Sequence, residues 1–298
     1  PDRPLAESIA VATRSSHTRL NKSIIARLPM VTRATDSSSY ITGLLHIAPI
    51  YLTFEACWDV ILETPPSQHV EGEDTCGTAP TTRADDGDIS TASSHASVRL
   101  QKPVVCDRLR TLLQQLQLPG LMRSGRLRAD IRALTGWTED VVEEQLRIAG
   151  ECGRLGEFTA HIKRSIEHRP QALVAYSYIL FMALFAGGRF IRATLESAGD
   201  SFWNDTPSPV KPSMLECSPQ SPEVSPTSDS TANELGTPLS FFRFATPEDG
   251  EDLKREFKGR LLEAETILTQ QEKHDIVQES VCIFDNMELL VGQLDKIC

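Results

Sequence analysis

The stretch that decides the fold is Gln171–Arg192, QALVAYSYILFMALFAGGRFIR, which contains the longest charge-free apolar run in the chain. A membrane span needs about 20 apolar residues, whereas this run is shorter and carries Tyr176, Ser177 and Tyr178 in its first half. A helix that is apolar on all its sides is typically enclosed by other helices. The stretch therefore predicts a buried core helix rather than a membrane-spanning one.

Two adjacent glycines, Gly187 and Gly188, end this apolar run. A glycine inside a helix costs about 1 kcal/mol relative to alanine, so a pair of glycines calls for a structural reason. A bend in the helix, or a flat ligand that lies against its backbone, would supply that reason.

The composition limits the classes of function and the compartment. The chain has 298 residues, a formal net charge of -11 and a pI near 5.2, which argues against the basic face that non-specific nucleic-acid binding requires. Its seven cysteines are dispersed and include no C-x-x-C pair, so we expect reduced thiols rather than a disulfide framework or a zinc site. This usage predicts an intracellular protein, cytoplasmic or associated with the endoplasmic reticulum. No signal peptide is visible, and any membrane association would come through a segment not in this chain.

Two stretches rich in small polar residues and proline interrupt the helical pattern, at residues 64–97 and 204–238. Neither stretch holds enough large apolar residues to offset the entropy that ordering would cost. We predict that both are disordered insertions within a single domain that covers residues 1–298.

The remaining chain shows helical periodicity almost throughout. Apolar residues recur at spacings of three and four, and strand-like alternation is nearly absent. The sequence also lacks a G-x-G-x-x-G after a strand, a Walker loop and a G-x-S-x-G elbow. These observations predict an all-α, multi-helical bundle.

Two residues on the first two expected helices are candidates for a site. The first helix begins near Asp2 and Pro4, and His17 lies beside its apolar stripe. A lone histidine in that position is more often a structural or surface residue than a metal ligand. The second helix runs from residues 36–39 to 63 and carries Tyr51 in a core stripe. A buried tyrosine with any available hydrogen-bond partner is the simple interpretation.

Several charged residues have a plain interpretation as solvated surface. Lys254 and Lys258 are four residues apart and share one helix face, which is typical of the outer face of an amphipathic helix. Arg189 and Arg192 close the apolar run and either pair with acids, pair with ligand carboxylates or remain solvated. We expect a solvated surface position for a basic patch and two histidines: Arg123, Arg126, Arg128, His161 and His168.

Separated blocks of the sequence resemble the heme oxygenase family. They are, in chain order, Ala12–Thr18, Ile50–Glu55, Val174–Tyr178 with Gly187-Gly188, and Leu239–Phe244 followed by Lys254 and Lys258. No single block is decisive, but their order and spacing agree with the family. The resemblance implies a heme oxygenase-like fold, in which heme lies between a proximal helix and a distal helix that bends at glycines.

The resemblance also implies roles for individual residues. His17 matches the axial ligand of the heme iron, and an imidazole suits that role. Tyr51 matches a member of the distal polar network, and Tyr178 matches a position near a heme propionate. Lys254 and Lys258 fall where the family holds the propionates. Gly187 and Gly188 would form the distal wall over the iron.

The chain departs from the family in the distal helix. Aligned on Gly187-Gly188, the family's first distal glycine corresponds to Ala183 and the acidic residue after it to Leu184. In heme oxygenases that carboxylate holds the water network that delivers protons to iron-bound oxygen. A leucine side chain can neither donate nor accept a hydrogen bond. Either Tyr51 or Tyr178 supplies the network here, or ring opening is impaired.

Three functions follow from the resemblance and from this departure. The first is a heme oxygenase that opens heme, both substrate and cofactor, to biliverdin, carbon monoxide and iron, using O2 and electrons from an NADPH-dependent reductase. The second is a non-catalytic heme-binding sensor or carrier that has lost the distal carboxylate, and Leu184 favours it. The third and least favoured is a scaffold of the same fold without heme.

Overall fold

The computed structural model describes residues 3–33, 36–64, 105–203, 210–213 and 238–294, and these residues form helices with no strand among them. The prediction of an all-α bundle is confirmed. The predicted insertions at 64–97 and 204–238 fall largely outside the described residues. The elements in chain order are α1 (Leu5–Arg33), α2 (Ser38–Glu63), α3 (Asp107–Leu116), a 3-10 turn (Pro119–Leu121), α4 (Ser124–Thr135), α5 (Glu139–Glu151), α6 (Gly153–His168), α7 (Ala172–Ala183), a π turn (Leu184–Gly188), α8 (Arg189–Glu196), α9 (Asp200–Trp203), a 3-10 turn (Ser240–Phe242), α10 (Glu251–Ile267) and α11 (Gln270–Leu294).

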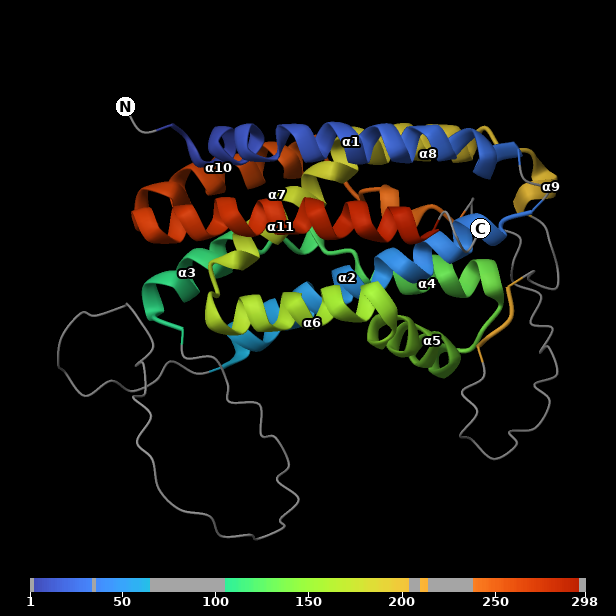
Figure 1. Cartoon of the computed structure of the whole chain (residues 1–298), viewed down its shortest axis with the longest axis horizontal. Helices are drawn as coiled ribbons and strands as arrows, with labels where there is room; N and C mark the ends of the chain where they lie inside the picture. Colours follow the sequence, from blue (N-terminus) through green and yellow to red (C-terminus); the bar gives the residue numbers. More distant parts are fainter. Residues whose placement is uncertain (1–2, 34–35, 65–104, 204–209, 214–237, 295–298) are drawn as a thin grey trace, which may run out of the picture.

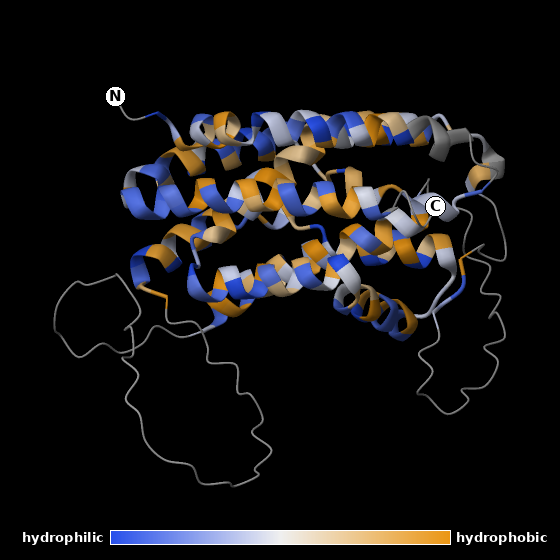
Figure 2. Ribbon diagram, in the orientation of Figure 1, coloured by the Kyte–Doolittle hydropathy of each residue, from blue (hydrophilic) through white to orange (hydrophobic). Residues whose placement is uncertain are grey.

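The helices pack in two groups that share one apolar core. α1 lies along one edge of the molecule and packs on α11, while α2 packs on α4, α5 and α6 at the opposite edge (Figure 1). One continuous cluster of buried apolar side chains extends from α1 to α11. Hydrophobic and hydrophilic residues alternate along α1 and α11 (Figure 2), as expected for helices that bury one face.

Helix α7 is the enclosed helix that the sequence predicts. Residues 172–177 are buried without interruption, and Leu180 and Phe181 are buried in the next turns. By length and composition the segments Ser38–Glu63 and Ala172–Glu196 could each cross a membrane, but 50% of each apolar window is buried inside the molecule. α7 therefore serves as a core helix in this fold.

The helix continues through the glycine pair instead of ending there. Leu184–Gly188 forms a π turn between α7 and α8. A π turn widens the helix locally, and such turns are a common cause of helix bending and are frequent at functional sites. The irregularity that Gly187 and Gly188 predicted thus takes the form of a π turn.

The buried side chain of Arg123 connects the loop that follows α3 with the loop that precedes α10. The prediction that Arg123 is solvated is wrong, because its side chain is fully buried. Its guanidinium donates hydrogen bonds to the carbonyl oxygens of Leu121, Phe241 and Arg243 at 2.8, 3.3 and 2.9 Å. It also lies 4.4 Å from the centre of the Phe244 ring. These partners replace the lost water, and burial lowers the pKa of Arg123 to about 10.

A buried glutamate joins α6, α7 and α11. The side chain of Glu279 is 1% exposed and accepts hydrogen bonds from Tyr176 Oη at 2.6 Å, Ser165 Oγ at 2.7 Å and His161 Nε2 at 2.9 Å. Burial alone would raise the pKa of Glu279, but these hydrogen bonds outweigh it and leave the pKa below its ordinary value. His161 is not freely solvated as expected, because it bonds to Glu279 and only 31% of its side chain is exposed, whereas His168 is exposed as expected.

Candidate functional site

The end of α7, the π turn and α8 together form what we call the distal segment or distal helix. One face of it is open to solvent. Ala183, Ala186 and Gly187 are exposed, and Phe190 is 54% exposed. Because these residues recur every three or four positions, they share one side of the helix; we call them the open face. An added Cβ at Gly187 would meet no atom within 4 Å. The open face thus combines three small residues with one exposed aromatic ring, and a flat apolar molecule could lie close to the backbone at Gly187.

The opposite side of the same segment belongs to the core. Leu184 is 3% exposed, and Gly188 is buried. A Cβ at Gly188 would lie 3.3 Å from the carbonyl oxygen of Ala183 and 3.5 Å from Cδ1 of Phe242. Position 184, which matches the family's acid, is therefore occupied here by a buried core side chain.

His17 lies on α1 with its ring exposed. Thr13 and Ser16 on the same helix are buried, whereas His17 is exposed and its ring packs edge-on against Phe284 of α11 at 5.6 Å between ring centres. Neither ring nitrogen has a hydrogen-bond partner within the described residues. α1 contacts α8 as well as α11, and Figure 1 shows α8 alongside α1. An exposed imidazole with free nitrogens, on a helix that contacts the distal segment, is a chemically suitable axial ligand.

No group of three or more His, Cys, Asp or Glu side chains that could hold a metal ion occurs in the described ranges. His17 therefore stands without a second protein ligand of these types. A metal bound by His17 would have to bring other ligands with it, which is what an iron porphyrin does.

The two tyrosines differ in their surroundings. Tyr51 is 2% exposed, and its hydroxyl donates to the carbonyl oxygen of Leu180 in α7 at 2.9 Å. Tyr178 is half-buried against the core. Burial raises the pKa of both phenols, which makes each a weaker proton donor than a tyrosine in water. The hydrogen bond from Tyr51 to Leu180 attaches α2 to α7 one turn before the π turn.

The predicted lysines lie on α10 at different depths. Lys254 is half-buried, and its Nζ lies 3.3 Å from the carboxylate of Glu251 and 5.7 Å from the centre of the Phe185 ring. Glu251 also pairs with Arg189 at 2.6 Å, so Lys254 is tied to the distal segment through this acid. Lys258 is exposed, and no carboxylate oxygen lies within 4.0 Å of it in the described chain. The structure thus brings Lys254, but not Lys258, into contact with the distal helix.

The turn before α10 was not singled out from the sequence. Gly250 has φ 83°, and a Cβ there would lie 2.5 Å from Cγ of Phe244 and 2.9 Å from Cε1 of Phe185. Only glycine meets both demands without strain. The preceding Asp249 pairs with Arg192 at 2.7 Å, so of the three alternatives for Arg189 and Arg192 the structure shows pairing with acids rather than the more usual solvated helix end. The Asp-Gly dipeptide is a recognised turn signal and could have marked this position.

Comparisons with known proteins agree with this architecture. No family model matches the sequence. The heme-binding protein HMX1 of Saccharomyces cerevisiae is 27% identical over 206 residues, which cover 66% of this chain and 59% of that protein. Heme oxygenase 2 from Chlamydomonas reinhardtii, crystallised without heme, superposes with a TM-score of 0.62 at 16% identity over 97% of each chain. Heme oxygenase-2 from Synechocystis sp. PCC 6803, in complex with heme and NO, superposes with a TM-score of 0.60 at 15% identity over 99% of this chain and 86% of that chain.

Proposed function

Because this chain has the heme oxygenase fold, we propose that it binds heme between α1 and the open face and opens the ring to biliverdin, carbon monoxide and iron. The observation that carries the proposal is the open face itself, which lies on a segment that contacts α1, the helix that carries the exposed His17. The name of the yeast relative, a heme-binding protein, supports the ligand. The chain spans 59% of that relative's length, so the complete activity is part of the proposal.

The residues present fit a heme. Gly187 leaves room for a planar ring close to the backbone, and the free imidazole of His17 offers an axial nitrogen. Lys254 and Lys258 would supply cations for two propionates, and their long stems let the charges reach the pocket edge. The bound heme would contribute the redox-active iron and the ring that is oxidised, with O2 from solution and electrons from an NADPH-dependent reductase.

The chain's own residues would position the ligand and control its surroundings. Tyr51 fixes the carbonyl of Leu180 and with it the orientation of the distal helix. The pairs of Arg189 with Glu251 and of Arg192 with Asp249 hold the π turn and α8 against the turn before α10. Proton delivery has to avoid position 184, because Leu184 is buried and carries no polar group.

A heme-binding sensor or carrier without oxygenase chemistry is the second candidate. Leu184 favours it, since the residue at the family's carboxylate position is apolar and belongs to the core. In that case the open face and His17 would keep their binding role, and heme would be released without chemical change.

A hemin titration followed by absorbance tests both candidates. Reductant and air are then added to the same cuvette. A stoichiometric Soret band that decays to a biliverdin spectrum supports the oxygenase, and a stable band supports the sensor or carrier. The absence of a Soret band would reject both.

The ligand assignment is tested by His17→Ala, with His168→Ala as the matched control. His168 is exposed on α6, and its Nδ1 lies 2.7 Å from the carbonyl oxygen of Arg164, so its loss should leave the heme spectrum unchanged. We expect His17→Ala to lose the histidine-ligated Soret band, and free imidazole to restore it. An unchanged Soret band in His17→Ala would contradict the assignment.

A further inference from the structure

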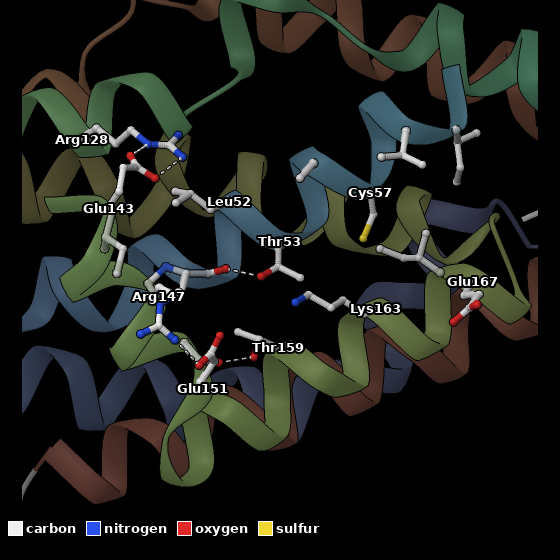
Figure 3. A pocket seen from close by; sticks show the side chains of 17 residues that line it. Leu52, Thr53, Cys57, Arg128, Glu143, Arg147, Glu151, Thr159, Lys163 and Glu167 are labelled. Atoms are coloured by element: carbon white, nitrogen blue, oxygen red, sulfur yellow. Dashed lines mark hydrogen bonds and ion pairs between the residues drawn. The ribbon is translucent and has the colours of Figure 1, made fainter. Parts of the chain in front are cut away.

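An open pocket lies far from the proposed heme site. It is lined by residues of α2, α4, α5 and α6, at the opposite edge of the molecule from α1 and α8 (Figures 1 and 3). Its volume is about 530 Å³, within the range of roughly 300 to 1,000 Å³ that small-molecule sites occupy. Nothing in the proposed function uses this space.

The walls of the cavity are mostly apolar. Leu52 and Cys57 of α2 face Leu146 of α5 and Ile166 of α6. Gly150 also lines the pocket, and a Cβ there would lie 3.2 Å from the Pro49 side chain. The cavity therefore offers an apolar lining that a hydrocarbon group would bury favourably.

Four of the charged residues at the rim form two ion pairs, and one cation and one carboxylate are left over in the described chain. Arg128 forms an ion pair with Glu143, and Arg147 pairs with Glu151 at 2.6 Å. Lys163 also lines the cavity, yet no carboxylate oxygen lies within 4.0 Å of its ammonium group in the part of the chain that the structure describes. Within the described residues the pocket thus carries one unpaired cation, that of the exposed Lys163, and one unpaired carboxylate, that of Glu167, beside an apolar lining.

The hydroxyl groups that line the pocket are not available to donate a hydrogen bond to an anionic ligand. Thr53 donates to the carbonyl oxygen of Pro49 at 2.6 Å, and Thr159 donates to that of Gly150 at 2.6 Å. Each hydroxyl has one proton, so neither can donate a second hydrogen bond to an anion. Recognition of an anionic group would fall to Lys163.

Figure 3 shows how these groups are oriented. The ammonium group of Lys163 extends into the pocket toward Thr53, and the thiol of Cys57 points into the same space. Glu167, which also lines the pocket, lies at the other end with its carboxylate directed away from Lys163. An elongated ligand could place its anionic end at Lys163 and its apolar part along the wall past Cys57.

We propose that this pocket binds an amphipathic monocarboxylate, a fatty-acid-like molecule with one anionic group. Its carboxylate pairs with Lys163, and its hydrocarbon part packs on Leu52, Cys57 and Ile166. One free cation specifies one anionic group, and the volume limits the chain to medium length. The proposal is independent of heme binding.

Calorimetric titration of the full chain with dodecanoate tests the proposal, after one equivalent of hemin has been added. We expect one dodecanoate per chain, and about tenfold or more weaker binding in Lys163→Met, because a charge-assisted hydrogen bond is lost. Binding of dodecanol, which lacks the charge, should be the same in both proteins. Arg164→Met is the matched control, since Arg164 is exposed on the same helix and does not line the pocket.

Two further measurements locate the ligand. Ala56 is exposed and lines the pocket, so Ala56→Trp should fill the space without disturbing the core and abolish binding of both probes at an unchanged melting temperature. Dodecanoate should also slow alkylation of Cys57 by N-ethylmaleimide, followed by peptide mass spectrometry. Failure of dodecanoate to bind, its displacement by excess hemin, equal weakening of dodecanol in Lys163→Met, or full binding in Ala56→Trp would each overturn the proposal.

Discussion

The two halves of one apolar helix have opposite environments in this molecule. Residues 172–177 of α7 are enclosed. The hydroxyl of Tyr176 donates a buried hydrogen bond to Glu279 of α11 at 2.6 Å. From the last residue of α7 through the π turn into α8, the same helix exposes Ala183, Ala186, Gly187 and Phe190 on one side. From Gln171 up to Gly188 the sequence is free of charged residues, so its composition does not mark where the open face begins.

This difference separates stability from ligand binding along a single element. Changes in the buried half should alter the free energy of unfolding, because they remove core contacts or partners of a buried charge. Changes on the open face should alter heme affinity and leave stability nearly constant, because no other part of the described protein packs there. The following predictions test that separation.

The largest loss of stability is expected for Glu279→Ala. This change leaves His161, Ser165, Tyr176 and Arg169 without the carboxylate that they share, and breaking a buried charged network typically costs about 3–5 kcal/mol. Urea unfolding followed by circular dichroism measures the loss. Glu288→Ala is the control, since Glu288 also lies on α11 and pairs with Arg19 in an exposed ion pair. Equal stability of the two variants would contradict a structural role for the buried network.

A smaller loss is expected for Gly250→Ala. Alanine would have to adopt the left-handed φ of 83° and place its Cβ 2.5 Å from the Phe244 ring, and such strain costs about 1–3 kcal/mol. Gly259→Ala on α10 is the control, because its Cβ would meet nothing within 4 Å and alanine favours the helix. Thermal melts should therefore shift in opposite directions. A shift in the same direction would argue against strain at Gly250.

The contribution of Glu279 should also depend on pH. Its pKa lies below the ordinary value because the hydrogen bonds from His161, Tyr176 and Ser165 outweigh the effect of burial. Stability from a carboxylate with a lowered pKa is fully present above the unfolded pKa of about 4.3 and is lost as pH falls through the lower folded pKa. Urea midpoints of the wild type and Glu279→Gln, measured from neutral to acid pH, should therefore converge at low pH. A difference between the two urea midpoints that stays constant with pH would show that ionisation of Glu279 contributes nothing to stability.

The smallest effect on stability is expected for Gly187→Leu. The new side chain meets no atom within 4 Å at its Cβ and gains helix propensity, so the melting temperature should not fall. Heme affinity should fall about tenfold or more, because leucine would occupy the space against which the ring lies. Gly292→Leu on α11 is a matched exposed helical glycine with open space around it and should bind hemin as the wild type does. Unchanged heme affinity in Gly187→Leu would place the ligand elsewhere.

Local features of the fold follow from local patterns, whereas the roles of the site residues came from the resemblance. The π turn lies at the glycine pair that the sequence marked, and Thr138, which precedes two acids, caps α5 by accepting from the amide of Val141 at 3.4 Å. The resemblance to heme oxygenases implied the fold that the solved structures share. Partners distant in sequence were missed, among them the ion pair of Arg189 with Glu251, because spacing along one helix says nothing about the helix that packs over it.

The sequence by itself determined the helices, because helix periodicity, capping groups and glycine effects act within a few residues of one another. Only the tertiary structure decided which apolar residues are core and which form an open face, that Arg123 is enclosed, and that His161 pairs with a buried carboxylate. Burial of a charged side chain depends on whether carbonyls, hydroxyls or carboxylates from distant segments replace its water. Those segments meet only when the chain has folded.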